Sequence, residues 1–463
     1  MTLDAVASAV AGRVAEPATG RVVVDAPVVV DSRQATAGAL FAAVVGEQVD
    51  GHSFAGDAAE RGAVAALASR PVTGLPAVLV DDVVAALGAL AQHVLATLRT
   101  VAAPSVVGIT GSSGKTSTKD VLAQVLAASG PTIAPAGSFN NEIGLPLTVL
   151  RADASTRHLV LEMSARGIGH IAALCAIAPV DVAVVLNVGT AHLGEFGSRE
   201  AIAAAKGELL DGVVGGGSTI LNVDDPLVAA MTTRARGRVV TVGQAAAADV
   251  RAADVTLDPA GRASYTLVTS AGSSLVQLQL VGGHHVANSL AAAAAALELG
   301  MTQEAVTDAL CAAVPLSRWR MEMRQTPDGV RLVNDAYNAN PESMRAALAA
   351  LVHIGAGQTT WAVLGPMAEL GDDGPAEHLA LGRHCVEIGV SHVVAVGEAA
   401  RAIADGVRSG GGDVVECADA QAAVELLRAR LVQGDTVLVK ASRAAGLEQV
   451  ADALAPDRSG EAA

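Results

Sequence analysis

One short segment, residues 106–118, constrains the fold of this 463-residue chain more than any other. An apolar run at 106–109 predicts a short buried strand, and a loop of small residues at 110–114 follows it. Lys115 and Thr116 then begin a stretch whose apolar residues recur at helical spacing. In such an arrangement, loop N–H groups and the helix N-terminus can bind phosphates, a lysine can neutralise them, and a hydroxyl can join the shell of Mg²⁺. The segment therefore predicts a nucleoside triphosphate site in an α/β domain.

The spacing of this loop differs from the common phosphate-binding pattern. That pattern has four residues between its first glycine and the Gly-Lys pair. Here only Ser112 and Ser113 separate Gly111 from Gly114. Gly-x-x-Gly-Lys-Thr alone is a weak signal, but its position between a strand and a helix strengthens the interpretation. The alternative is a glycine-serine turn with an exposed Lys115.

Composition narrows the range of possible partners. The formal net charge of −16 at pH 7 argues against nucleic acid or an anionic membrane as the main partner. Aromatic residues make up only 2% of the chain, so the cores must consist of Ala, Val and Leu, and few rings can stack on a base or a sugar. An anionic substrate requires local basic residues and Mg²⁺ to offset the overall charge.

The cysteines and the N-terminal residues indicate the cellular compartment in which the protein is expected. The four cysteines lie far apart without a Cys-x-x-Cys pair, which favours buried free thiols in a reducing cytosol over a zinc site or disulfides. Asp4 precedes any Lys or Arg, so the start lacks the basic region of a signal peptide. No apolar run reaches the ~20 residues of a membrane span, and the segment 171–189 is interrupted by Pro179 and Asp181. We expect a cytoplasmic protein without membrane insertion.

Alternating strand and helix patterns predict three α/β domains, at 1–103, 104–314 and 315–463. The central alternation is the one that a parallel sheet requires. The predicted strands are 22–24, 28–30, 63–66, 77–80, 105–109, 158–162, 182–187, 330–334, 360–364, 393–396 and 436–439. The predicted helices are 83–98, 117–128, 167–177, 199–210, 289–299, 342–352, 376–388 and 421–431.

Three further polar residues are candidates for the same site, each with an ordinary alternative. Glu162 ends a predicted strand, where a P-loop sheet commonly holds Mg²⁺, although it could also be a surface residue. His192 follows another predicted strand and either joins that crevice or is simply solvated. Lys206 lies in an Ala-rich helical stretch, where a lysine usually extends to water, so alone it indicates no site.

The polar segment 334–340 is the second informative stretch. It follows the predicted strand at 330–333 and ends at Pro341. Such clusters bind ligands or build turns through side-chain to backbone hydrogen bonds, and the sequence leaves both interpretations open. Arg318 and Arg320, just upstream, can bind phosphate or be ordinary surface charges.

Together these segments resemble the Mur ligases, the ATP-dependent amide-forming enzymes of peptidoglycan precursor synthesis. The resemblance covers most of the chain, in family order, at 110–116, 139–146, 161–163, 191–193, 196–198, 205–208, 335–341 and 367–371. The segments 337–341 and 367–371 resemble the branch that adds D-alanyl-D-alanine to UDP-N-acetylmuramoyl-tripeptide. The resemblance implies a small N-terminal UDP-substrate-binding domain, a central ATP-binding domain with a P-loop parallel sheet, and a C-terminal Rossmann-like ligase domain. We expect a monomer.

The resemblance also implies roles for individual residues. ATP would be bound by Thr110, Gly111, Ser112, Ser113, Gly114, Lys115, Thr116, Asn288, Arg320 and Asp335. Thr116 and Glu162 would hold Mg²⁺, His192 a second Mg²⁺, and Lys206 would be a carbamate whose oxygens suit the metal. The substrate would contact Ser32, Arg33, Asn140, Asn141, Tyr337, Asn338 and Asn340. Lys115, Lys206 and His192 would be the catalytic residues.

The chain departs from the family pattern at a few positions. His285 and Ser138 stand where the family commonly has Asn, and Ala441 interrupts the usual Lys-Gly-Ser-Arg. These departures concern secondary contacts rather than the phosphate site.

Three alternative functions are each disfavoured by a different feature of the sequence. A sibling amide ligase, such as the ligase adding the third residue or folylpolyglutamate synthase, is disfavoured by the segment 337–341. A P-loop GTPase is disfavoured because no Asn-Lys-x-Asp guanine reader occurs. A nucleotide-sensing scaffold without catalysis is disfavoured by the presence of Lys115, Glu162, His192 and Lys206.

Overall fold

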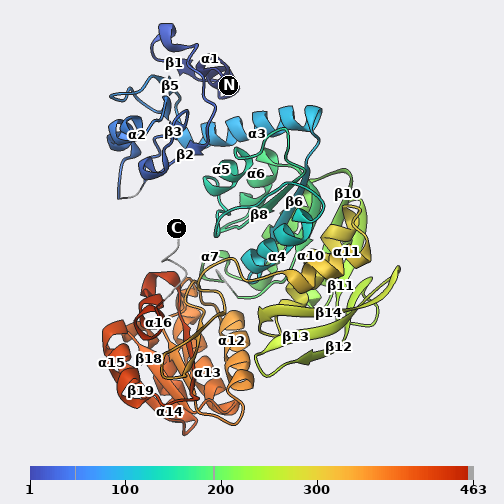
Figure 1. The fold of residues 1–463 in the computed structure, drawn as a ribbon, viewed down its shortest axis with the longest axis vertical. Coiled ribbons are helices and arrows are strands. Elements are labelled where there is room, and N and C mark those ends of the chain that lie inside the picture. Colours follow the sequence, from blue (N-terminus) through green and yellow to red (C-terminus); the bar gives the residue numbers. More distant parts are fainter. Residues whose placement is uncertain (47, 191–192, 457–463) are drawn as a thin grey trace.

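The computed structural model describes residues 1–46, 48–190 and 193–456. In these residues the chain forms sheets of five, nine and six strands, which follow one another along the sequence. Figure 1 shows the corresponding N-terminal, central and C-terminal parts, each with helices packed on its sheet. Three successive α/β units are what the sequence predicts. The boundaries at 103/104 and 314/315 stay predictions.

The N-terminal sheet has the strand order β1-β5-β4-β3-β2, parallel throughout except for β1 against β5. The predicted strand at 22–24 is wrong, because Val23 makes only an isolated bridge to Thr2. A strand at 40–42 was not predicted, since this short apolar run is buried on both faces and shows no alternation. The elements are α1 (Leu3–Ala9), β1 (Arg13–Val14), β2 (Val28–Val29), β3 (Leu40–Ala42), α2 (Ala55–Glu60), β4 (Ala65–Ala68) and β5 (Ala77–Leu79).

The long helix α3 (Val83–Val101) connects the N-terminal and central parts. Asp82 begins it by accepting hydrogen bonds from the backbone N–H groups of residues 84 and 85. By length and composition alone α3 could cross a membrane, so the expectation that no segment reaches that length is wrong. Its buried side chains belong to two protein cores, Leu87 to the N-terminal one and Leu95 to the central one. This burial is that of a core helix joining two units.

The central sheet has the strand order β14-β13-β12-β11-β10-β9-β6-β8-β7. It is parallel from β7 to β12, as predicted, but β12, β13 and β14 are antiparallel. This meander was not predicted, although β14 alternates between buried and exposed residues, which is the usual pattern of a strand with one exposed face. The strands are β6 (Ser105–Thr110), β7 (Thr132–Ile133), β8 (His158–Glu162), β9 (Val180–Val185), β10 (Val213–Asn222), β11 (Arg238–Gly243), β12 (Val250–Leu257), β13 (Arg262–Thr269) and β14 (Gly272–Val281).

The Ala-rich helix α10 (His285–Glu298) packs against α4 and the central sheet. Ala291–Ala296 are all buried, which confirms the predicted helix at 289–299 and extends its start to His285. The other helices of this part are α4 (Lys115–Ala127), α5 (Gly144–Val149), α6 (His170–Ile177), α7 (Leu193–Phe196), α8 (Arg199–Asp211), α9 (Pro226–Ala229) and α11 (Gln303–Ala312).

The C-terminal sheet has the strand order β15-β16-β20-β17-β18-β19, with only β15 antiparallel to its neighbour. Its strands are β15 (Glu322–Gln325), β16 (Arg331–Asn334), β17 (Thr360–Leu364), β18 (His392–Val396), β19 (Val414–Cys417) and β20 (Thr436–Lys440). Its helices are α12 (Pro341–Ile354), α13 (Gly374–Glu387), α14 (Arg401–Ser409), α15 (Ala420–Arg430) and α16 (Glu448–Leu454). Because β16 and β20 are adjacent and parallel, the residues that follow both strands meet at one edge.

Candidate nucleotide-binding site

The loop between β6 and α4 is held tightly against its neighbours. A Cβ atom at Gly111 would lie 2.9 Å from the Cβ of Leu186, and one at Gly114 would lie 2.5 Å from Oδ1 of Asn288. Gly114 also has a φ of +80°, which residues with a side chain rarely adopt. The Nζ of Lys115 donates to the carbonyl of Gly111 over 2.7 Å. The loop therefore has the close backbone packing that a phosphate-binding turn needs, and Lys115 is half-buried, which argues against a glycine-serine turn with an exposed lysine.

Residues that follow β9 hold the two serines of the loop in place. The backbone N–H of Ser113 donates to Oδ1 of Asn187 over 2.9 Å. The N–H of Gly189 donates to Oγ of Ser112, also over 2.9 Å. Asn187 follows β9, the strand beside β6. Asn187 was not predicted as a site residue, although its position just beyond a buried strand is the signal that could have identified it.

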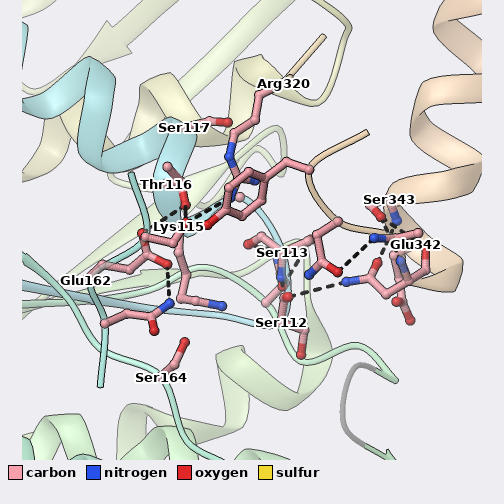
Figure 2. Close-up of a pocket in the computed structure, with 18 of the residues that line it drawn as sticks. Ser112, Ser113, Lys115, Thr116, Ser117, Glu162, Ser164, Arg320, Glu342 and Ser343 are labelled. Atoms are coloured by element: carbon pink, nitrogen blue, oxygen red, sulfur yellow. Dashed lines mark hydrogen bonds between the residues drawn. The ribbon is translucent and has the colours of Figure 1, made fainter. Parts of the chain in front are cut away.

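A cavity of about 580 Å³ opens between this loop and the C-terminal part of the chain. Figure 2 shows Lys115, Thr116 and Glu162 together at one side of it, Glu342 and Ser343 at the other, and Ser112 and Ser113 between them. The predicted site residues that line it are Ser112, Ser113, Gly114, Lys115, Thr116, Asn140, Asn141, Glu162, Asn288, Arg320, Asp335, Tyr337, Asn338 and Asn340.

Sheet register explains why Glu162 reaches the loop. Glu162 pairs with Ile109 of β6, so the carboxyl ends of the two strands lie side by side. The hydroxyl of Thr116 donates to Oε2 of Glu162 over 2.9 Å. Nδ2 of Asn140 donates to the other carboxylate oxygen over 2.8 Å. Glu162 is only 2% exposed, so the alternative of a surface residue after the strand is wrong.

The C-terminal wall of the cavity contains a buried ion pair. Nζ of Lys440 lies 2.5 Å from Oδ2 of Asp335 and also donates to the carbonyl of Asn338 over 2.9 Å. The backbone N–H of Met321 donates to the other Asp335 oxygen over 3.1 Å. Lys440 was not among the predicted site residues, and the register of β16 and β20 is what brings it to Asp335.

Asn340 confirms the turn-building interpretation of the segment 334–340, whereas ligand binding stays a prediction. Its side chain caps α12 in a reciprocal pair with Ser343, which is the turn-building role. Its Nδ2 also lies 3.5 Å from the carbonyl of Ser112, across the cavity. Tyr337, three residues earlier, stacks under the guanidinium of Arg320 at 4.3 Å from the ring centroid. Arg320 is thus held at the cavity rather than free on the surface.

The start of α10 contributes an unexpected pair of histidines. His284 and His285 lie with ring centroids 4.3 Å apart, and both line the cavity beside Asn288. Burial lowers the pKa of both imidazoles below the usual value. Both rings are therefore neutral near pH 7.

Lys206 does not extend to water, and that expectation from the sequence is wrong. It lies in α8 with only 5% of its surface exposed. Burial lowers the pKa of its ammonium to about 7, and the positive charge of Lys115 adds to the shift. Burial also lowers the pKa of Lys115, while the negative charge of Glu162 opposes that effect. The two lysines therefore share one desolvated region, although Lys206 does not line the cavity itself.

Four other predicted residues lie outside the cavity, and one lies outside the described residues. Thr110, the last residue of β6, and Gly111, at the start of the loop, are both buried. Ser32 and Arg33 belong to the N-terminal part, where Asp31 accepts from the backbone N–H and the side chain of Arg33. His192 falls in the gap at 191–192.

Comparison with protein families gives three matches along the chain. They are the Mur ligase family catalytic domain at residues 27–94, the Mur ligase middle domain at 109–296, and the Mur ligase glutamate ligase domain at 319–443.

Among curated proteins, the chain is similar to UDP-N-acetylmuramoyl-tripeptide–D-alanyl-D-alanine ligases. It is 48% identical to that of Mycobacterium tuberculosis (strain ATCC 25618 / H37Rv), with 92% of this chain and 91% of the relative covered. It is 37% identical to that of Escherichia coli (strain K12), with 92% and 93% covered.

Among solved structures, a crystal structure of MurF from Acinetobacter baumannii matches with a TM-score of 0.88 and 32% identity over 98% of both chains. MurF ligase from Thermotoga maritima in complex with ADP matches with a TM-score of 0.79 and 31% identity, covering 92% of this chain and 96% of that one.

Proposed function

This chain belongs to the Mur ligase family, and from that premise we propose that it joins D-alanyl-D-alanine to UDP-N-acetylmuramoyl-tripeptide at the expense of ATP. The observation that carries the proposal is the single cavity in which Lys115, Thr116 and Glu162 face the segment 335–340. Curated relatives that match over nine-tenths of their length bear the name of this activity.

The reaction proceeds in two steps. The terminal carboxylate of the tripeptide attacks the γ-phosphorus of ATP, so that a C–O–P bond forms, the bond to the β-phosphate oxygen breaks and ADP leaves. The free amine of D-alanyl-D-alanine then attacks the carbonyl carbon of this acyl phosphate. Phosphate leaves with the C–O bond pair, and the amine loses a proton to solvent. A carboxylate itself resists the amine because its leaving group would be oxide, and phosphorylation removes that obstacle.

The task of the protein is to bring two anions together. The carboxylate and the γ-phosphate repel one another, and a cation fixed between them lowers that cost most in a site sheltered from water. Lys115 is the cation of this loop, and its donation to the carbonyl of Gly111 holds its amine at the cavity. Orientation of both reactants within one cavity makes the amine attack effectively unimolecular.

The donor set of the cavity fits Mg²⁺. The Thr116 hydroxyl and the Glu162 carboxylate are hard oxygen ligands in mutual contact. Among the residues that the structure describes, no group of three His, Cys, Asp or Glu is placed to hold a metal. Such a sparse set suits Mg²⁺, which keeps waters and takes phosphate oxygens as its remaining ligands. When bound, the metal supplies charge neutralisation for the phosphates.

Lys206 has the property that carbamate formation requires. Only the neutral amine reacts with carbon dioxide, and a pKa of about 7 makes that form abundant near neutral pH. We assign Asn288, Arg320 and Asp335 to ATP, and Asn140, Asn141, Tyr337, Asn338 and Asn340 to the peptide substrates. Ser32 and Arg33 are assigned to the uridine nucleotide, and His192 to a second Mg²⁺. We further propose domains at 1–103, 104–314 and 315–463 in a monomeric, cytoplasmic enzyme that does not insert into a membrane.

Phosphate release tests this function. We expect phosphate from ATP only when UDP-N-acetylmuramoyl-tripeptide and D-alanyl-D-alanine are both present. A substrate panel separates this activity from that of a sibling ligase. In it, glutamate or a diamino acid replaces D-alanyl-D-alanine, and the UDP-N-acetylmuramoyl-dipeptide or a folate replaces UDP-N-acetylmuramoyl-tripeptide. Turnover with one of those pairs, and none with the proposed pair, would contradict the proposal.

A further inference from the structure

Ser138 lies in the loop after β7, within hydrogen-bond distance of Arg320 in the C-terminal part. Its Oγ is 2.9 Å from the hydroxyl oxygen of Thr116. It also accepts a hydrogen bond from Nη2 of Arg320 over 3.1 Å. One small hydroxyl therefore contacts both the first turn of α4 and a residue 182 positions further along the chain.

The hydrogens of this group can be assigned by elimination. Thr116 has one hydroxyl hydrogen, which it donates to Oε2 of Glu162. The hydroxyl hydrogen in the Ser138–Thr116 contact must then come from Ser138. Since the guanidinium of Arg320 can only donate, every link in the series points the same way.

The result is a directed chain with opposite charges at its ends. It runs from the Arg320 cation through two hydroxyls to the Glu162 carboxylate, where Asn140 donates to the second oxygen. Hydrogen bonds in series polarise one another, and charged ends strengthen them. Within this series, Ser138 links Arg320 of the C-terminal part to Thr116 in the first turn of α4.

Arg320 has little else to hold it. Apart from its contact with Ser138, it stacks on the ring of Tyr337, and its buried Nε has no hydrogen-bond partner among the described residues. Stacking fixes the distance of a guanidinium from a ring but leaves it free to slide and rotate in the plane. The hydrogen bond to Ser138 is what fixes the direction in which Arg320 points into the cavity.

We propose that Ser138 is a positioning residue for ATP, which orients Arg320 and Thr116 together before the nucleotide binds. The inference rests on the proposed function, because it takes Arg320 and Thr116 as phosphate and metal contacts. Without the hydroxyl, Arg320 becomes ordered only when the nucleotide binds, so the entropy lost in ordering its side chain reduces the free energy of binding. The loss is therefore one of ATP affinity more than of turnover at saturation.

The test compares Ser138→Ala with Ser138→Thr, which keeps the hydroxyl, in the full-length enzyme. Removal of a hydrogen bond to a charged group predicts a KM for ATP that is about tenfold higher in Ser138→Ala, with kcat changed less than threefold. Ser138→Thr should restore most of the loss. Ser273→Ala, on the exposed part of β14, is the matched control. An unchanged KM in Ser138→Ala, an equal loss in both variants, or an effect confined to kcat would overturn the proposal.

A titration with MgADP provides a second measurement that needs no turnover. In the Arg320→Gln background, Ser138→Ala should raise the Kd by a smaller factor than it does in the wild type, because one of the two groups that Ser138 orients is already gone and only Thr116 remains. Additive losses in the double variant would also overturn the proposal. Wild-type enzyme that binds MgADP but forms no amide would instead contradict the proposed function. The titration would still test the role of Ser138, because the Kd for MgADP does not depend on turnover.

Discussion

Nζ of Lys440, at the end of β20, lies 2.5 Å from Oδ2 of Asp335, at the end of β16, and the lysine side chain is only 2% exposed. The pair joins two neighbouring strands at the edge that faces the cavity. A buried charge without its partner is costly, whereas loss of both charges is much less so.

Lys440→Met should therefore destabilise the enzyme by about 3 kcal/mol, because it leaves Asp335 charged and unpaired. Urea unfolding measures the change. In the double variant with Asp335→Asn, most of the stability should return. Equal losses in the single and double variants would show that the lysine acts through packing and not through the pair.

Lys206 should make stability depend on pH. Its pKa is lowered to about 7 in the folded protein, while the unfolded chain keeps the ordinary pKa near 10.5. Between these values the unfolded state binds more protons, so stability rises with pH, by up to ~1.4 kcal/mol per unit. Urea unfolding measures how the free energy of unfolding changes with pH. It is carried out on the wild type and on Lys206→Met, between pH 7 and 9, in buffers free of carbon dioxide. The variant should show a flatter profile, and identical slopes would contradict the burial of a neutral amine.

Gly114→Ala should weaken nucleotide binding. The new Cβ would lie 2.5 Å from Oδ1 of Asn288, and the φ of +80° disfavours any side chain. Strain of this kind costs about 1–3 kcal/mol, or roughly 5- to 150-fold in the Kd for MgADP. Calorimetry gives the Kd, and Gly411→Ala, which shares a positive φ but meets no neighbour, is the control for the backbone effect. If both variants bind MgADP like the wild type, the close packing of the loop is not needed for binding.

Lys115→Ala should lower kcat for phosphate release by far more than tenfold, because among the described residues no other lysine lines the loop side of the cavity. Loss within tenfold, worth ~1.4 kcal/mol, would mean that another group neutralises the phosphates. Lys115→Arg separates charge from geometry, and the urea midpoint of each variant reports whether the fold is intact.

The parts of the fold that the sequence predicts are those with a strong local pattern. Strand β6, the loop at 110–114 and helix α4 follow directly from an apolar run, small residues and helical spacing. The meander β12–β14 was missed although its strands alternate between more and less buried residues, so the local signal was present and was not interpreted.

The site was predictable where residues follow strands, and less so where contacts join distant segments. Glu162 was found from its place at the end of β8. The burial of Lys206 depends on how α8 packs, which no local pattern reveals, so the residue was expected to extend to water. Ser138 and Lys440 gain their partners only through tertiary contacts, across 182 and 105 positions respectively.

The most direct test of the central claim follows an oxygen atom. UDP-N-acetylmuramoyl-tripeptide labelled with ¹⁸O in its terminal carboxylate is incubated with ATP, D-alanyl-D-alanine and enzyme, and the released phosphate is analysed by mass spectrometry. An acyl phosphate predicts one ¹⁸O in each phosphate, because the carboxylate oxygen leaves with phosphorus. Amide formation that yields phosphate without ¹⁸O would contradict the account.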